Sequence, residues 1–246
     1  MKRFFAVLLV VGFSLLGYSV VLAQSSAALH AIAGAPYSAV AEERHTQTLA
    51  DGTHIDLIRA VTKQFRDAQG RTRMEHYSAR EGATSPTPNL IEIVDPVAGV
   101  RYVLNPTALT AQAFSLSRGA APMIASSGDL GAPVTVTGPT ISTADGARPD
   151  ITHESLGADS ILGVAVNGMR TTMVYPVGAR GNDQPLTIVI EAWRSNELRI
   201  DMQRKQDDPR TGVVEWYVTQ IDRAEPDASL FQVPPEYQVT EVPARQ

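Results

Sequence analysis

The fold class of this chain is decided by the stretch ELRIDMQRKQ, which runs from Glu197 to Gln206. Apolar side chains stand at alternate positions in it, and charged or amide side chains stand between them. This alternation is typical of a β-strand that packs one face and exposes the other. The apolar positions are Leu198, Ile200 and Met202, and the expected solvent positions are Arg199, Asp201, Gln203 and Lys205.

The same short-range alternation recurs along the chain, separated by turn residues. We expect hairpins between the following pairs of segments: Ser38 to Ala50 with Thr53 to Arg66 across Asp51-Gly52, Leu90 to Val94 with Val100 to Leu104 across Asp95 to Gly99, Ile161 to Val166 with Met169 to Tyr175 across Asn167-Gly168, and Leu186 to Arg194 with Glu197 to Gln206 across Ser195-Asn196. We also expect Asp67 to Gly70 to form a turn that leads into a strand from Arg71 to Ser78. About ten strands in sequential hairpins predict a mainly β fold with one antiparallel sheet.

The register of the last hairpin predicts a shared apolar face. A two-residue turn at Ser195-Asn196 sets Trp193 opposite Leu198 and Val189 opposite Met202. Matching apolar with apolar residues in the next pair of strands places Trp216 near Met202 and Val218 near Ile200. The predicted buried face consists of Trp193, Leu198, Ile200, Met202, Val214, Trp216 and Val218. Such a face is either a packed core or an apolar concavity, and for the concavity the candidate ligand-binding residues are Val189, Trp193, Leu198, Ile200, Met202, Trp216 and Val218.

The N-terminus has the layout of a secretory signal peptide. Lys2 and Arg3 precede an apolar run, and the run ends at Ala23, a small residue suited to a cleavage site, before Gln24. We therefore expect cleavage after residue 23, export to the periplasm or the medium, and no stable membrane span afterwards. A permanent anchor is the alternative, because the run is nearly long enough to cross a bilayer.

Composition limits the classes of partner and chemistry. Removing residues 1–23 from the 246-residue chain leaves 223 residues and, without Lys2 and Arg3, changes the formal charge from −5 to −7. An acidic body argues against nucleic acid as a partner. The chain has no cysteine, which excludes disulfides, thiolate chemistry and a cysteine-linked lipid.

One stretch differs in character from the rest. From about residue 105 to residue 153, prolines are scattered among alanine, glycine, serine and threonine. Such a sequence buries little, so we expect a mobile insertion in an otherwise single domain over residues 24–246. A short helix is expected around residues 108–116.

No catalytic or metal-binding set stands out. His153-Glu154 begins like a zinc-protease motif, but Gly157 stands where the second histidine must be. The turn at Asp51-Gly52 sets His54 opposite Leu49 and His45 opposite Ile58. We predict no catalytic residues, no metal and no cofactor.

Several motifs carry a resemblance to known proteins. They are the stretch Asp67 to Arg73, Ile93 to Gly99 with Tyr102 to Pro106, Glu191-Ala192-Trp193, and the closing Pro226-Asp227 with Leu230-Phe231 and Val233 to Tyr237. The chain resembles an uncharacterised family of exported bacterial proteins, and its strand order is similar to the periplasmic lipoprotein-carrier (LolA-like) superfamily. That resemblance implies a curved antiparallel half-barrel around one or a few helices, with acyl chains held on its concave face.

Three hypotheses follow from these observations. The first is a non-enzymatic periplasmic protein that binds an apolar or lipid-like ligand on its sheet. The second is an interaction or regulatory module that reads another envelope protein, for example by adding a strand at an open edge. The third is an enzyme whose site the sequence does not mark.

Overall fold

The computed structural model describes residues 33–80, 83–116 and 148–243. Thirteen strands and one 3₁₀ turn lie in these ranges. They are β1 (Tyr37–Thr48), β2 (His54–Arg66), β3 (Thr72–Arg80), β4 (Ala83–Thr84), β5 (Leu90–Asp95), β6 (Val100–Asn105), β7 (Thr110–Ser115), β8 (Asp150–Ile161), β9 (Val164–Tyr175), β10 (Leu186–Ser195), β11 (Ile200–Asp208), β12 (Gly212–Asp222), η1 (Ala228–Phe231) and β13 (Gln238–Val242).

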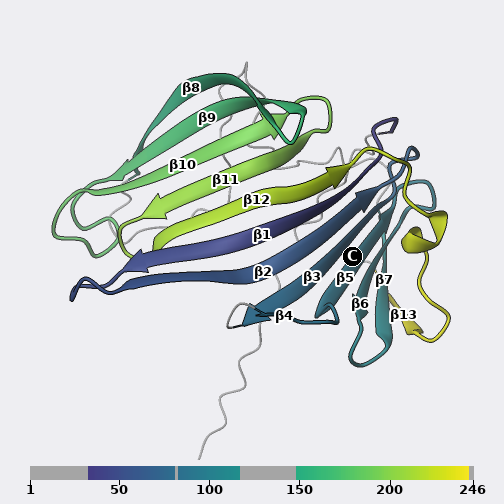
Figure 1. Cartoon of the computed structure of the whole chain (residues 1–246). Helices are drawn as coiled ribbons and strands as arrows, with labels where there is room; N and C mark the ends of the chain where they lie inside the picture. The colour runs from purple at the N-terminus through teal and green to yellow at the C-terminus, as the bar shows by residue number, and fades with distance from the viewer. Residues whose placement is uncertain (1–32, 81–82, 117–147, 244–246) are drawn as a thin grey trace, which may run out of the picture.

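The strands form one open, curved sheet, which confirms the predicted mainly β, antiparallel fold class (Figure 1). Twelve strands follow the order β13-β7-β6-β5-β3-β2-β1-β12-β11-β10-β9-β8, and β4 pairs only with β3. Two series of sequential hairpins, β1 to β7 and β8 to β12, are joined where β1 pairs with β12. All pairs are antiparallel except β13 with β7.

The structure corrects the predicted number and type of elements. The sheet path has twelve strands and not about ten, because β7, β8 and β13 were not anticipated, while the two strands predicted at residues 161–166 and 169–175 are essentially one strand, β9. The helix expected around residues 108–116 is wrong: residues 110–115 form β7, which pairs with β6 and β13. Alanines favour a helix locally, but tertiary pairing overrides that preference. One or a few helices were expected, and the one helical element within the described residues is the short 3₁₀ turn η1.

The turn predicted at Asn167-Gly168 is also wrong. Both residues lie inside β9, and the chain turns earlier, where Ile161 pairs with Val164. Gly168 is needed for packing: a Cβ atom there would lie 2.7 Å from Cζ3 of Trp193 and 2.8 Å from Cβ of Leu156. The glycine therefore provides a flat site for the tryptophan ring on the paired strand.

The hairpins at Asp51-Gly52 and Asp95 to Gly99 are confirmed, but the register at the first tip differs by one residue. His54 pairs with Thr48 and His45 with Leu57, where Leu49 and Ile58 were expected. The cause is the length of the tip loop: the N–H of Leu49 donates to the carbonyl of Thr53, so residues 50–52 form a three-residue loop. The irregularity between Glu43 and Arg44 then restores the expected register, with Glu43 paired with Ala60.

The β10–β11 hairpin has a longer loop than predicted. Ser195 pairs with Ile200, so residues 196–199 form a four-residue loop, and Arg199 at its end has a left-handed φ of 53°. Trp193 consequently pairs with Gln203 and not with Leu198, and Val189 pairs with Asp207 and not with Met202. The predicted register of this hairpin is wrong.

Buried residues gather in three clusters. The first joins Leu198, Met202 and Val218 to the start of β1, and the second holds Ile91, Ile93, Leu104 and Ala111 under Val233 and Tyr237. The third lies at the far end of β9 and β10, and it consists of Tyr175, Ala179, Leu186 and Ile188. The C-terminal segment, which carries η1 and β13, thus covers part of the β3 to β7 half of the sheet.

Two sequence predictions fall wholly or partly outside the described residues. The signal peptide at residues 1–23 lies outside them, and so does the central part of the insertion expected at residues 105–153. The two ends of that stretch contain β7 and the start of β8. No helix in the described part of the chain is long and apolar enough to cross a bilayer.

Candidate functional site

A row of alternating charges crosses one face of the sheet. Six residues on six neighbouring strands pair directly in register, and directly paired residues share a face. In order from β8 to β1 they are Glu154, Arg170, Glu191, Lys205, Glu215 and Arg44. We call this row the charge ladder.

Ion pairs join several members of the charge ladder. Arg170 bonds Glu154 at 2.9 Å and Glu191 at 2.8 Å, and the pKa of Arg170 is raised because its guanidinium donates first to Glu191 and then to Glu154. Lys205 lies 3.6 Å from Glu215. Opposite charges side by side favour this strand order, and they form one polar row across this face of β8 to β12.

The opposite face of the same strands is apolar. Glu191 and Ile190 are neighbours in β10, so their side chains point to opposite faces. Three adjacent cross-strand rows lie on the Ile190 side. The rows are Ser155, Met169, Ala192, Arg204 and Trp216; then His153, Thr171, Ile190, Gln206 and Val214; then Ile151, Met173 and Ile188. We call these three rows the apolar face.

Most of the apolar face is only partly covered. Ile188 is buried, whereas Met169, Met173, Ile190 and Trp216 are half-buried. Ile151, at the outer edge, is 48% exposed. A half-exposed apolar surface that spans several strands is the kind of surface that takes a ligand or a partner.

One end of the apolar face is closed by the β9–β10 loop. The guanidinium of Arg180 lies 4.5 Å from the centre of the Tyr175 ring and donates to its hydroxyl at 3.0 Å. Asp208 accepts from Arg210 at 2.7 Å, and this bond is the main reason that the pKa of Asp208 is lowered. The boundary of the apolar face is therefore a polar, well-bonded rim.

The predicted ligand-binding residues are divided between different places. Trp216 lies on the apolar face. Trp193 and Val189 lie on the side of the charge ladder, because each is two residues from Glu191 in β10 and residues two apart on a strand share a face. Leu198, Met202 and Val218 are buried, and Ile200 packs against them. The ligand-binding role predicted for the seven residues is not tested by these positions and stays a prediction.

Both tryptophans nevertheless pack against the same buried cluster. Irregular pairing occurs beside it, between Trp193 and Arg194 on β10 and between Val40 and Ala41 on β1. Such β-bulges twist a strand and re-aim side chains, so residues from both sides gather at this end of the sheet. The sequence signal for the apolar face was present in the alternation of β9 and β10, but the turn predicted in the wrong place concealed it.

A buried polar network lies on β3, under the C-terminal segment. Glu75 accepts from Arg73 at 2.7 Å and from the hydroxyl of Tyr77 at 2.6 Å, and Arg73 donates to the carbonyl of Leu230 at 3.1 Å. Burial, followed by the bond to Glu75, raises the pKa of Tyr77. Both carboxylate oxygens of Glu75 are engaged, so the network fastens η1 to the sheet and offers no acid–base pair to a substrate.

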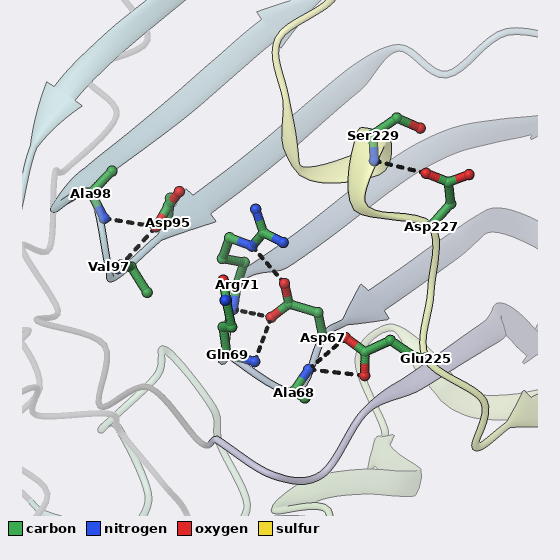
Figure 2. A network of polar contacts seen from close by, with 10 residues as sticks. All are labelled: Asp67, Ala68, Gln69, Arg71, Asp95, Val97, Ala98, Glu225, Asp227 and Ser229. Carbon is green, nitrogen blue, oxygen red and sulfur yellow. Dashed lines mark hydrogen bonds and ion pairs between the residues drawn. The ribbon is translucent and has the colours of Figure 1, made fainter.

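A second network connects the β2–β3 turn to the same segment (Figure 2). Asp67 accepts from the backbone N–H of Gln69 at 3.0 Å and of Arg71 at 2.8 Å, and from the Arg71 side chain at 2.5 Å. Glu225 accepts from the N–H of Ala68 at 3.0 Å. These bonds fix a turn that the sequence predicted, and the described residues around it hold no group of three or more metal-ligating side chains.

Arg66, beside this turn, is buried without a carboxylate partner. It is 3% exposed and donates to the carbonyl of Ala35 at 2.7 and 2.9 Å and to the carbonyl of Leu198 at 2.9 Å. The Tyr37 ring lies 4.8 Å from the guanidinium carbon. Desolvation lowers the pKa of Arg66. This residue ties the β10–β11 loop to the start of β1, and its role is structural.

Comparison with known proteins gives similarity in solved structures alone. No family model matches the chain, and no curated protein matches it. An uncharacterized conserved protein from Thermus thermophilus aligns at 8% identity with a TM-score of 0.42, over 85% of this chain and 91% of that chain. The MucA/MucB complex from Pseudomonas aeruginosa aligns at 12% identity with a TM-score of 0.39, over 84% of this chain and 58% of that chain.

A lipoprotein-sorting protein domain is also among the similar structures. This putative outer membrane domain, from Vibrio parahaemolyticus, aligns at 8% identity with a TM-score of 0.28, over 80% of this chain and 89% of that chain. All these TM-scores are below 0.5. Ligand and function therefore have to be argued from the residues of this chain.

Proposed function

We propose that this chain is an exported, non-enzymatic envelope protein that binds an apolar or lipid-like ligand on the apolar face of β8 to β12. The observation that carries the proposal is the contrast between the two faces of the same strands. One face is crossed by ion pairs, and the other presents three adjacent rows in which most side chains are apolar and all but Ile188 are half-buried or exposed. The buried networks around Glu75 and Asp67 are engaged in bonds that hold the fold together.

The apolar face has dimensions that suit an acyl chain. Five neighbouring strands about 4.8 Å apart span roughly 19 Å. One leaflet of a bilayer core, which a single acyl chain crosses, is about 15 Å thick. A chain lying across the strands could therefore run along one row and contact the next, and each methylene that it buries contributes about 0.8 kcal/mol.

One basic side chain in the first row suggests how the ligand is oriented. Arg204 is exposed and pairs in register with Ala192 on one side and Trp216 on the other. A guanidinium at the margin of an apolar surface suits a carboxylate or phosphate head group. We therefore expect an anionic amphiphile with one acyl chain, such as a fatty acid.

The proposal is tested with palmitate binding to two matched variants. Ile190→Lys places a charge in the middle row of the apolar face, and Val189→Lys places the same charge on the next residue of β10, on the other face. Ile190→Lys should weaken palmitate binding by about tenfold or more, which corresponds to ~1.4 kcal/mol, and Val189→Lys should leave it unchanged. Equal losses in two folded variants would contradict the proposal.

The head-group assignment has its own test. Arg204→Gln should reduce the affinity for palmitate and leave the affinity for hexadecanol, which lacks the carboxylate, unchanged. If both affinities fell together, Arg204 would act through the fold and not through the head group. If neither changed, the carboxylate would bind elsewhere.

A further inference from the structure

The outer edge of β8 is open in the described part of the chain. β8 is the last strand in the order of the sheet, and it pairs with β9 on one side only. It is twelve residues long, and nearly all of its residues are exposed. An edge strand presents backbone N–H and C=O groups that can pair with another extended chain.

The charge ladder ends at this edge with an acidic residue that has a basic partner on one side only. The sign alternates along the ladder, and its last member, Glu154, is an acid whose side chain is 64% exposed. Asp150 and Asp159 also lie on β8, while the strand has no lysine or arginine. Asp150 and Glu154 are four residues apart and therefore point to the same face.

The apolar face ends at the same edge. Ile151 begins the third apolar row, is paired with Met173, and remains 48% exposed. A strand added outside β8 would place one side chain beside Ile151 and another beside Glu154, on opposite faces of the extended sheet.

We infer that the edge of β8 binds an extended segment of another protein as an added strand, with a basic side chain opposite Glu154 and an apolar side chain opposite Ile151. In the antiparallel direction the partner carries a basic residue at position i, an apolar residue at i+3 and a second basic residue at i+4, opposite Asp150. A second copy of this chain is a poor occupant, because its own β8 would bring further carboxylates to an acidic edge.

This interaction shares Ile151 with the apolar face, but its backbone pairing and its charged contacts do not require the ligand proposed there. The residues Asp150 to Glu154 lie at the margin of the sheet. Beyond Ser155 an irregularity beside Gly157, which has a left-handed φ of 86°, shifts the register of β8 on β9, and the pairing then continues to Ile161. We therefore expect the added strand to pair with the first half of β8.

The test uses the peptide Thr-Lys-Val-Thr-Ile-Lys-Val-Thr, blocked at both ends, and a copy with both lysines replaced by glutamate. The full mature chain should bind the lysine peptide, bind the glutamate peptide at least about tenfold more weakly, and lose affinity for the lysine peptide as the salt concentration rises. Backbone amides of β8 should exchange hydrogen more slowly in the complex, since added-strand pairing protects them.

Charge reversal provides the decisive control. Asp150→Lys with Glu154→Lys should exchange the preference, so that the variant binds the glutamate peptide better than the lysine peptide. The matched control, Glu236→Lys with Glu241→Lys, makes the same change in net charge on exposed residues near the opposite edge and should keep the original preference. The inference is overturned if the control exchanges the preference, if the β8 variant does not, or if β8 amides show no protection.

Discussion

Gly168 and Trp193 should be strongly coupled in stability, because the tryptophan ring occupies the space of the missing side chain. In a Gly168→Ala variant the new Cβ would lie 2.7 Å from Cζ3 and 2.8 Å from Cε3 of Trp193. Overpacking of this kind costs about 1–3 kcal/mol. The backbone itself accepts alanine, since Gly168 does not have the left-handed conformation of the turn glycines.

A double-mutant cycle in urea isolates this coupling. Without the ring, Gly168→Ala should cost less, because only the contact with Leu156 remains and alanine restricts the unfolded chain, which is worth about 0.4–1 kcal/mol. The change is therefore measured in the wild type and in a Trp193→Leu background. The new Cβ would also lie 2.8 Å from the Cβ of Leu156, and because this contact is present in both backgrounds, its cost cancels in the cycle. We expect a coupling free energy of about 1–2 kcal/mol in favour of the double variant.

The cycle also separates two roles for the glycine. If residues 167–168 formed a hairpin turn, alanine would destabilise the chain equally with or without the Trp193 ring, and the coupling would be zero within error. That result would refute the pairing of β9 with β10 on which both faces of the sheet are based.

Three further changes test the buried contacts. Replacing Arg66 with Met should lower the free energy of unfolding in urea by about 2–5 kcal/mol, because two backbone carbonyls lose their donors in a buried site; a loss below about 1 kcal/mol would contradict its role. Arg210 holds the pKa of Asp208 below its usual 3.8, so the stabilisation by Asp208 is complete above about pH 4 and is lost as the pH falls through the lowered folded value. Arg210→Gln should therefore flatten the acid limb of the stability–pH curve, and an unchanged slope would refute the assignment. The pKa of Tyr77 is raised, so the contribution of Tyr77 to stability is complete below about pH 10 and declines as the pH rises further. The difference between the ultraviolet titrations of the wild type and of a Tyr77→Phe control reports the ionisation of Tyr77, and it should appear only on unfolding.

Much of the fold could be predicted because its turns have local chemical causes. Asp95 accepts from the backbone N–H groups of Val97 and Ala98, and Gly99 closes the loop with a left-handed φ of 71°. Asp67 fixes its turn in the same way. Aspartate at the start and glycine at the end are readable in a sequence, so these hairpins were located correctly.

The same loop geometry is harder to predict where no glycine ends it. The loop after Asn105 ends at Leu109 with φ of 51°, and the loop after Ser195 ends at Arg199 with φ of 53°. Neither residue type favours the left-handed region. The loop length at Ser195 was therefore taken as two residues and not four, which set Trp193 opposite the wrong partner.

The candidate site depended on that register, and this is why it could be predicted only in part. Alternation along β11 was read correctly, with Met202 buried, but the relation between β10 and β11 was set by the loop. β8 was missed because it is exposed and polar, with few apolar side chains to show a period of two. Which residues of β8 lie on each face of the sheet is set by its pairing with β9.

The claim that a ligand lies on the apolar face is tested most directly by contact quenching of two single-tryptophan proteins. The chain has two tryptophans, so Trp193→Phe leaves Trp216 on the apolar face, and Trp216→Phe leaves Trp193 on the charge-ladder face. Titration with 9,10-dibromostearate, whose bromines quench indole on contact, should quench the fluorescence of Trp216 saturably and leave that of Trp193 nearly unchanged. Equal quenching of both, or quenching of Trp193 alone, would contradict the account.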